Sequence, residues 1–470
     1  MQNENVQNNH HGYLNLVAWI ACMGALCFGF GTSVVNGALD FMAKPSQLGL
    51  SAWAQGIVSS GLTLGAAFGA VFGTPLSDKI GRKKELIWMG VIFTILGIGC
   101  ALAPNTATIV VLRFIMGLAI GAASALVPVY LAEIAPAESR GKFVSMNQLL
   151  IVGGQFLIML INSALASTIG VHDAAVWRWM LFTISIPGII LWFGMFLAPE
   201  SPQWYADHGK WSKALETLSK IRSKAQAEAE LQDLKTHAKK LQEDEAHKAK
   251  FSDLGHGWVF QILLTASMLG IFQQFAGINS VMYYGNKILM SAGFPSQVAL
   301  WMSIANGIFS IVGALVGMFT VDKWGRRPLL LSGYVLCAVF LVLVALIGTF
   351  GGTAAWTGWA VMIIILVFIV VDQGTLGPVT WLYISELFPA RYRGVGAGVA
   401  TFVLWFANFI VALVAPQLLA VMGMNLFYIF AIVCLLGAWF GYKRLPETKG
   451  VPLDQVESFF RKSYDKDYKD

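Results

Sequence analysis

The sequence predicts an all-α membrane protein with twelve transmembrane helices, arranged as two parallel six-helix bundles. Of its 470 residues, 56% are hydrophobic and 12% are charged, whereas a soluble protein carries about 25% charged residues. The apolar runs are continuous rather than alternating, which predicts helices and not a β-barrel. Several polar motifs occur once in each half of the chain, which indicates an internal duplication.

Each predicted span supplies the roughly 20 apolar residues that a helix needs to cross the hydrocarbon core of a bilayer. The twelve stretches are 13–37, 53–77, 86–104, 107–131, 143–167, 177–197, 258–290, 298–321, 329–350, 357–384, 395–420 and 424–442. The polar residues before the first span contain neither Lys nor Arg and no evident cleavage site. We therefore expect an uncleaved tail that leads into the first span.

Basic residues gather in the loops after spans 2, 4, 8 and 10, whereas the loops after spans 3, 9 and 11 have none. The positive-inside rule then places these basic loops, and both termini, on the cytoplasmic side of the cell membrane. The net charge of +6 arises from these loops and does not indicate nucleic acid as a partner.

All five cysteines lie inside spans, without a CxxC or Cys/His cluster, so we expect no disulfide, metal or other cofactor.

The duplication is carried by polar motifs that follow corresponding spans in the two halves. The pattern Asp-x-x-Gly-Arg occurs at Asp78–Arg82 and again at Asp322–Arg326. The pattern Glu-x-x-Pro-x-x-x-Arg-Gly occurs at Glu133–Gly141 and again at Glu386–Gly394. Six spans per half, an even number, give both halves the same orientation, so the repeats are parallel.

These repeated charges predict a gating network at the cytoplasmic ends of the helices. Its members are Asp78, Arg82, Glu133, Arg140, Glu200, Asp322, Arg326, Glu386, Arg393 and Glu447. A half-buried network that forms in one conformation and breaks in another can bias a bistable protein by a few kcal/mol. The alternative is that the basic residues only fix the orientation of the chain, but repetition of the acids argues against it.

The chain divides into four expected parts. They are an N-terminal six-helix bundle at 1–200, cytoplasmic linker helices at 201–255, a C-terminal six-helix bundle at 256–443 and a cytoplasmic tail at 444–470. The linker sequence AQAEAELQDLKTHAKKLQEDEAHKAK has high helix propensity and mixed charge. A flexible connection would instead favour Gly and Ser.

Uncharged polar residues concentrate in span 7, in the sequence IFQQFAGINSVMYYG. They are Gln273, Gln274, Asn279, Tyr283 and Tyr284. Amides in a membrane helix are costly without partners, and they are groups that hydrogen-bond hydroxyls. At about 100° per residue, a straight helix cannot aim all five at one cavity, so we predict a local break at Gly277. The alternative is that they bind neighbouring helices together.

Taken together, the motifs resemble the sugar porter family of the major facilitator superfamily over nearly the whole chain. They are the Asp78–Lys83 block, Arg113 in RFIMGLAIG, the two Glu-x-x-Pro-x-x-x-Arg-Gly blocks, PESPQW, QQFAGINSVMYY, VDKWGRRP, GPVTW and LPETKG. The resemblance implies two bundles around a central site, joined by intracellular helices, that rock to expose the site to one side at a time. It also adds Arg113 to the expected charge network.

The resemblance implies a substrate site built from helices 5, 7, 10 and 11. Its residues are Gln148, Gln155, Gln273, Gln274, Asn279, Tyr283, Gly377, Trp381, Trp405 and Asn408, and Asn162 continues the face of the two helix-5 glutamines. Amides offer a donor and an acceptor to vicinal hydroxyls, and Trp offers a flat face to the C–H side of a sugar ring. The expected substrate is therefore a neutral monosaccharide, either hexose or pentose, or a cyclitol. No obligate protein partner is evident.

One departure from the family pattern bears on energy coupling. Proton-coupled members carry an acid in helix 1 where this chain has Gly31, and Arg113 is left without its usual partner. This favours facilitated uniport. The alternative is a proton symporter that uses another acid, such as Asp372 in span 10.

Two further departures concern substrate choice. Ser310 stands where the family has an Asn, with Asn306 one turn away, and Leu404 replaces a Gln.

Two other functional classes are disfavoured. A sugar sensor needs a long cytoplasmic signalling tail, and only a short stretch follows span 12; a membrane enzyme would need a catalytic triad, metal cluster or phosphate loop, and no such motif is evident.

Overall fold

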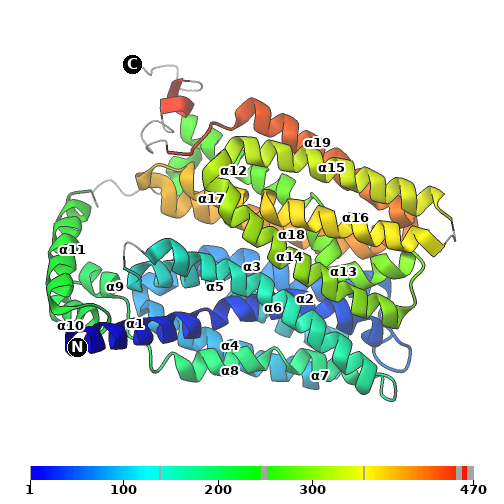
Figure 1. The fold of residues 1–470 in the computed structure, drawn as a ribbon, viewed down its shortest axis with the longest axis horizontal. Coiled ribbons are helices and arrows are strands. Elements are labelled where there is room, and N and C mark those ends of the chain that lie inside the picture. Colours follow the sequence, from blue (N-terminus) through cyan, green and yellow to red (C-terminus); the bar gives the residue numbers. More distant parts are fainter. Residues whose placement is uncertain are drawn as a thin grey trace.

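Long helices that run roughly along one axis form the body of the protein (Figure 1). The computed structural model describes residues 2–136, 139–244, 251–255, 257–352, 355–450 and 458–462, and these contain helices but no strand. The all-α prediction is therefore confirmed.

The first half of the chain forms one bundle, drawn in the lower part of Figure 1. Its helices are α1 (Gln2–Ala21), α2 (Met23–Met42), α3 (Ala52–Ile80), α4 (Arg82–Leu102), α5 (Thr106–Ile134), α6 (Arg140–Thr168), α7 (Val176–Phe182) and α8 (Ser185–Gly194). The linker forms α9 (Pro202–Asp207), α10 (Trp211–Ile221), α11 (Lys224–Asp244) and the short 3-10 helix η3 (Phe251–Gly255). The helices α9, α10 and α11 cover one end of the molecule, which we call the linker end.

The second half forms the other bundle, in the upper part of Figure 1. Its helices are α12 (Gly257–Gln274), α13 (Ile278–Ser291), α14 (Ser296–Trp324), α15 (Arg326–Phe350), α16 (Ala355–Gly374), α17 (Leu376–Glu386), α18 (Ala390–Met422), the 3-10 helix η4 (Gly423–Asn425) and α19 (Leu426–Arg444). The α2–α3 and α13–α14 connections lie at the end opposite the linker, which we call the far end.

The count of twelve spans agrees with the helices observed. Eleven stretches of the described residues are long and apolar enough to cross a membrane, and the last, Gly394–Arg444, is 51 residues long. That stretch contains both α18 and α19, and one crossing needs only about 20 residues. It therefore supplies two crossings, which makes twelve.

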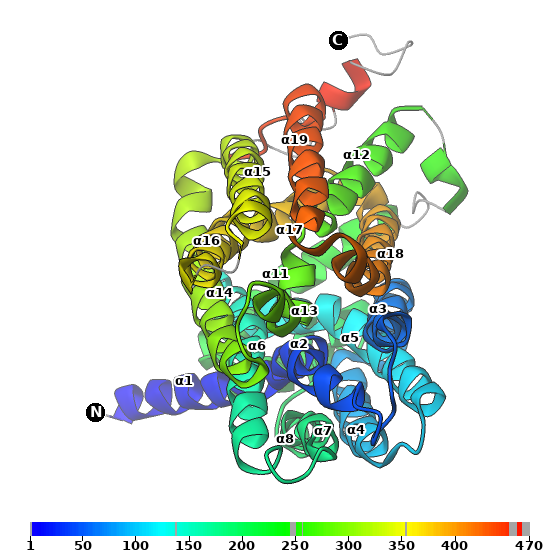
Figure 2. The same ribbon diagram turned by 90° about the vertical axis from the view of Figure 1, so that its right-hand side faces the viewer.

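The two bundles meet along two pairs of helices, with α3 packed against α18 and α6 against α14. Viewed from the far end, α13 lies near the middle of the molecule, between α2 and the outer helices of its own bundle (Figure 2). This arrangement brings the polar sequence of span 7 to the interface of the bundles.

Three stretches differ from their sequence-based description. Span 10, expected as one helix, is divided into α16 and α17 at Thr375, and span 6 is divided into α7 and α8. Pro187 lies in the first turn of α8, where its missing N–H costs no helical hydrogen bond, but it could not continue a helix from α7 without loss. The expected N-terminal tail is also helical, because α1 begins at Gln2, and the Tyr13 hydroxyl donates to the Leu197 carbonyl oxygen at 2.9 Å.

Candidate functional site

A cavity lies between the two bundles, and all ten predicted substrate residues line it. They are Gln148, Gln155, Gln273, Gln274, Asn279, Tyr283, Gly377, Trp381, Trp405 and Asn408. Sequence reasoning did not single out other lining residues, namely Phe28, Thr32, Ile151, Val152, Ile278 and Gln373. Asp372 and Leu404 complete the lining. The predicted residues thus come together at one place, and their contact with a substrate stays a prediction.

The helix of span 7 is broken where the sequence predicts it. The helix α12 ends at Gln274, and α13 begins after Gly277, which has φ +98°. This left-handed conformation favours glycine, and a Cβ at this position would lie 2.7 Å from Cδ2 of Phe430. The break lets Gln273 and Gln274 on one side, and Asn279 on the other, face the same cavity.

The amides around the break hold one another in place. Asn279 Nδ2 donates to Gln274 Oε1 at 2.5 Å, and Gln274 Nε2 donates to Gln273 Oε1 at 2.6 Å. The Tyr283 hydroxyl donates to Asn408 Oδ1 at 3.1 Å, which ties α13 to α18. All of these hydrogen bonds lie within the C-terminal bundle. They use only some of the donors and acceptors of these side chains, so the alternative role of binding neighbouring helices together explains the residues only in part.

Two buried polar atoms of the cavity wall have no hydrogen-bond partner among the described residues. They are Oε1 of Gln155, in the N-terminal bundle, and Nε1 of Trp405, in the C-terminal bundle. Gln155 is 9% exposed and Trp405 is 2% exposed. Buried polar groups are normally paired, so an acceptor and a donor remain for a ligand on opposite sides of the cavity. The centroids of the Phe28 and Trp405 rings lie 5.4 Å apart, and the two rings form an aromatic wall to which both bundles contribute.

Three polar residues expected at or near the site make other contacts. Asn162 Nδ2 donates to the Val34 carbonyl oxygen at 3.0 Å, and Ser310 Oγ donates to the Asn306 carbonyl oxygen at 2.8 Å. Asn162, Ser310 and Asn306 are all absent from the cavity lining. The structure therefore does not place Asn306 as a substitute for the family asparagine.

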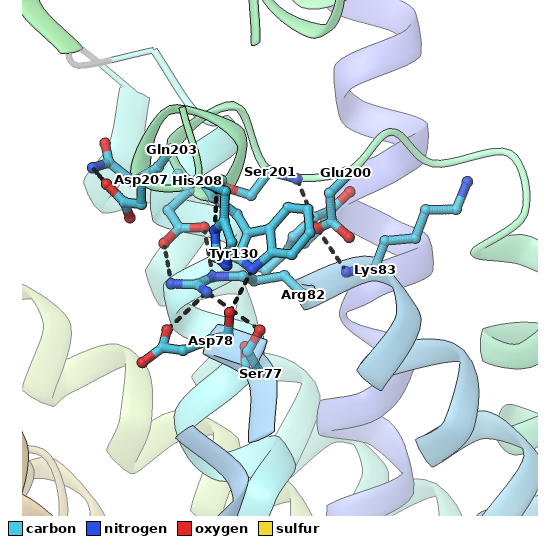
Figure 3. Close-up of polar contacts among 12 residues, drawn as sticks. Ser77, Asp78, Arg82, Lys83, Tyr130, Glu200, Ser201, Gln203, Asp207 and His208 are labelled. Carbon is cyan, nitrogen blue, oxygen red and sulfur yellow. Dashed lines mark hydrogen bonds and ion pairs between the residues drawn. The ribbon is translucent and has the colours of Figure 1, made fainter. Parts of the chain in front are cut away.

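At the linker end, the acids and bases of the N-terminal bundle form one cluster (Figure 3). Arg82 Nη1 lies 2.8 Å from Asp78 Oδ1, and Arg82 Nε lies 3.3 Å from Glu133 Oε2. The carboxylate of Glu200 accepts a hydrogen bond from the Lys83 backbone N–H at 3.0 Å. Arg82 thus joins α3 to α5, while Glu200 binds the start of α4.

The C-terminal bundle repeats this arrangement. Arg326 Nη1 lies 3.2 Å from Asp322 Oδ1, and Arg326 Nη2 lies 3.2 Å from Glu386 Oε1. Glu447 accepts hydrogen bonds from the backbone N–H groups of Arg326 and Arg327, both at 3.0 Å. The duplication in sequence is therefore a duplication of contacts.

The repeated glycine of each motif is explained by the carboxylate beside it. Gly81 and Gly325 have φ values of +103° and +88°. A Cβ at Gly81 would lie 2.3 Å from Oε2 of Glu200, and a Cβ at Gly325 would lie 2.7 Å from Oε2 of Glu447. Each glutamate thus accepts hydrogen bonds at the N-terminus of the helix that follows the glycine, where a negative charge is favourable. Asp78 and Asp322 instead bind arginine side chains.

The two capping glutamates differ in their ionisation. Burial raises the pKa of Glu200 above its ordinary value, against the backbone N–H groups of Lys83 and Ser201 that lower it. Burial also acts to raise the pKa of Glu447, but its hydrogen bonds to backbone N–H groups outweigh that effect and hold the pKa below the ordinary value. The Glu447 carboxylate is therefore the better stabilised of the two.

Three arginines of the expected network are not seen in it. The side chains of Arg140 and Arg393 lie outside the described part of the structure. Arg113 is 1% exposed and lies deep within the bundle. Its Nε donates to the Val58 carbonyl oxygen at 2.8 Å and its Nη2 donates to the Gly31 carbonyl oxygen at 3.3 Å. Backbone carbonyls thus bind the guanidinium where the family would supply a carboxylate.

Polar contacts join the two bundles at the far end. The Asn286 backbone N–H of α13 donates to Asn36 Oδ1 of α2 at 2.9 Å. Ser163 Oγ of α6 donates to the Leu300 carbonyl oxygen of α14 at 2.8 Å. These contacts hold the bundles together on that side of the cavity.

Comparisons with known proteins agree on one family. The family model described as "Sugar (and other) transporter" matches residues 17–460. The major myo-inositol transporter IolT of Bacillus subtilis (strain 168) is 42% identical over 462 residues, which cover 98% of this chain and 97% of that protein.

Solved structures give the same result for the fold. The inward-open conformation of the xylose transporter XylE from E. coli has a TM-score of 0.81 and 28% identity, over 95% of this chain and 99% of that chain. The proton:xylose symporter XylE bound to 6-bromo-6-deoxy-D-glucose has a TM-score of 0.78 and 28% identity, over 96% of this chain and 100% of that chain.

Proposed function

Because this chain belongs to the sugar porter family of the major facilitator superfamily, we propose that its central cavity carries a neutral cyclic polyol by alternating access. The chain is a multi-pass membrane transporter of sugars, not an enzyme. The observation that carries the finer proposal is the cavity itself, in which amides, aromatic rings and two unpaired polar atoms come together from both bundles.

We propose a cyclitol of the inositol class as the substrate. The residues described as lining the cavity include no Lys, Arg or His, so the site holds no cation for an anionic sugar. Several amides with paired donor and acceptor atoms suit a ring that carries a hydroxyl on every carbon. The 42% identity to a myo-inositol transporter over nearly the full length of both chains supports the same choice.

We further propose that this conformation opens toward the cytoplasm at the linker end. The far end carries the Asn286–Asn36 and Ser163–Leu300 contacts between the bundles. The TM-score of 0.81 to an inward-open transporter supports this direction. The basic loops at the linker end support its placement on the cytoplasmic face of the cell membrane.

The coupling mode depends on which acid can carry a proton. Gly31 has no titratable group, and Arg113 is bound by its carbonyl oxygen, so helix 1 supports facilitated uniport. The buried acid Asp372 in the cavity wall favours a second candidate, proton symport.

Binding of labelled myo-inositol to the purified protein, in competition with other unlabelled polyols and sugars, tests the proposed substrate class. We expect myo-inositol and close cyclitols to compete best, and Gln274→Ala to weaken binding of all of them. Gln226→Ala in the exposed linker helix α11 is the matched control. Unchanged affinity in Gln274→Ala, or competition only by charged sugars, would overturn the proposed site.

A further inference from the structure

We propose that a second cavity, between the linker helix α10 and the N-terminal bundle, binds a phosphate-ester group, and that the headgroup of an anionic phospholipid supplies it. None of the residues that line this second cavity lines the polyol cavity. The proposal therefore goes beyond the proposed function and does not depend on it.

The second cavity lies at the linker end and is built from segments distant in the sequence. They are α1 at Tyr13, the start of α4 at Lys83, the connection at residues 196–200, α9 at Tyr205, and α10. The cavity has a volume of about 390 Å³, which lies within the range of roughly 300–1,000 Å³ that is usual for small-molecule sites. It can therefore hold a phosphate group and the atoms attached to it.

The helix α10 presents a polar, mainly basic face to this cavity. Its lining residues are Lys213, Glu216, Thr217 and Lys220, and spacings of three and four residues place side chains on one face of a helix. Leu218, on the other face, is buried in a small apolar cluster with residues of α11. Packing against α11 thus turns the lysines of α10 toward the cavity.

Lys83 supplies a further ammonium group from the bundle side of the cavity. Its side chain extends away from Arg82 and the acids bound to it (Figure 3), and its Nζ donates to the Phe196 carbonyl oxygen at 3.1 Å. Lys83 and Lys220 lie close enough for their charges to repel each other. A phosphate group between them relieves this repulsion and accepts charge-assisted hydrogen bonds from both.

The two acids of the lining already have partners. Glu200 accepts hydrogen bonds from the backbone N–H groups of Lys83 and Ser201, at 3.0 and 2.9 Å. Glu216 pairs with Lys220 at 2.8 Å, but these side chains are 66% and 54% exposed, and such a pair is weak in water. An incoming phosphate group can therefore compete for Lys220.

An apolar rim beside the lysines favours a lipid over a soluble ester. Phe196 and Leu197 line the cavity at the end of span 6, and they are 59% and 63% exposed. Acyl chains can cover this apolar surface while the headgroup occupies the basic part of the cavity. Basic pockets at the cytoplasmic ends of membrane helices are suited to anionic headgroups in this way.

The site belongs to the N-terminal half alone, although one of its lysines lies in a repeated motif. Arg327 holds the place of Lys83 in the second half, and its Nη2 donates to the Tyr442 carbonyl oxygen at 2.7 Å. Its guanidinium also lies 5.6 Å from the centre of the Tyr442 ring. The lysines of α10 come from the linker, so the duplication does not supply them twice.

Native mass spectrometry of the purified, delipidated protein in detergent tests the proposal. The probe is phosphatidic acid, and phosphatidylcholine with the same acyl chains is the comparison without net charge. We expect phosphatidic acid to bind more tightly, and the double variant Lys83→Gln with Lys213→Gln to weaken its binding by about tenfold or more. Lys213→Gln alone, at an exposed position, should weaken it in the same direction and guards against misfolding of the double variant.

The matched control removes the same charge elsewhere in the linker. Lys224→Gln with Lys235→Gln, both in α11 and absent from the lining of this cavity, should bind phosphatidic acid within about twofold of wild type, since distant charges are screened. Equal binding of the two lipids by the wild-type protein, or equal losses in the two double variants, would overturn the site.

Two competitors separate the source of the phosphate and the two cavities. Glycerol 3-phosphate, which lacks acyl chains, should displace phosphatidic acid at least about tenfold less well than a second phospholipid of the same headgroup, because it leaves the apolar rim uncovered. Displacement as strong as that of the phospholipid would make the occupant a soluble ester and overturn the lipid assignment. Excess myo-inositol should displace nothing; displacement by it would place the probe in the polyol cavity and overturn a separate site.

Discussion

The ammonium group of Lys287 on α13 lies 4.0 Å from the carboxylate of Asp40 on α2, across the interface of the two bundles. Lys287 also contacts Gln55 of α3, and Asn286 Nδ2 contacts the Asp40 carboxylate. With the Asn286–Asn36 hydrogen bond, these residues form a cluster that we call the far-end latch. Alternating access requires it to break when the far end opens.

Removing one charge of the latch should favour opening of the far end. The Lys287 and Asp40 side chains are 23% and 19% exposed, and a pair with this exposure is worth about 1 kcal/mol, or about a fivefold change in populations. Spin labels at the exposed positions Ser46 and Gln297 would report the separation of the bundles, since the native cysteines are buried. We expect Lys287→Met to increase the longer-distance population.

Lys224→Met, at an exposed lysine of the linker helix α11, is the matched control and should leave the distances unchanged. Exchanging the two charges, in Asp40→Lys with Lys287→Asp, should partly restore the short distance. Equal effects of Lys287→Met and Lys224→Met would show that the latch does not set the conformational equilibrium.

Gly277→Ala should disrupt the cavity through the backbone. At φ +98°, with Phe430 2.7 Å from the added Cβ, alanine costs about 1–3 kcal/mol. We expect a lower unfolding temperature of the purified protein and weaker myo-inositol binding, because the amides on either side of the break lose their alignment. Gly398→Ala, where no atom lies within 4 Å of the added Cβ, should change neither measurement. Normal binding by Gly277→Ala would refute a role for the break.

Gln155→Leu should weaken substrate binding with little effect on folding. Oε1 of Gln155 has no hydrogen-bond partner among the described residues, so its removal leaves none of their donors unpaired. A lost hydrogen bond to a ligand is worth about 1–1.5 kcal/mol, or about tenfold in the dissociation constant. Equilibrium binding of labelled myo-inositol measures the effect, and Gln203→Leu in α9 at the linker end serves as the control. An unchanged dissociation constant in Gln155→Leu would remove this residue from the site.

Glu447→Gln should destabilise the C-terminal bundle at neutral pH. The carboxylate accepts two backbone N–H groups of α15, and the amide loses the charge and one acceptor, at about 1–3 kcal/mol. Since the folded-state pKa lies below the ordinary glutamate value, the stabilisation is complete above that value and disappears as pH falls through the folded-state pKa.

Thermal unfolding over a pH series tests this effect at Glu447. The difference between wild type and Glu447→Gln should be largest at neutral pH and should shrink in acid. Glu228→Gln, in the exposed face of α11, should show no difference at any pH. A difference that grows as pH falls would mean that the carboxylate is not the stabilised form.

The sequence was sufficient for features that depend on local pattern. Continuous apolar runs predict the spans, and Gly277 predicts the break in span 7. The ten residues named through the family resemblance all line one cavity, because the resemblance carries the three-dimensional arrangement with it.

Features that depend on contacts between distant segments could not be predicted. The glycine at Gly81 is required by the carboxylate of Glu200, more than one hundred residues later. The latch likewise pairs Asp40 with Lys287, which the duplication does not relate. The sequence shows Asp372 as an acid in a span, but not that its carboxyl oxygens have no hydrogen-bond partner among the described residues, because that depends on the helices packed around it.

Uptake of labelled myo-inositol into proteoliposomes tests the central claim most directly. We predict protein-dependent uptake that saturates with concentration, that unlabelled myo-inositol on the opposite side accelerates, and that Gln155→Leu weakens in apparent affinity. Vesicles that contain the folded wild-type protein and take up neither myo-inositol nor any neutral monosaccharide faster than empty vesicles would contradict the account.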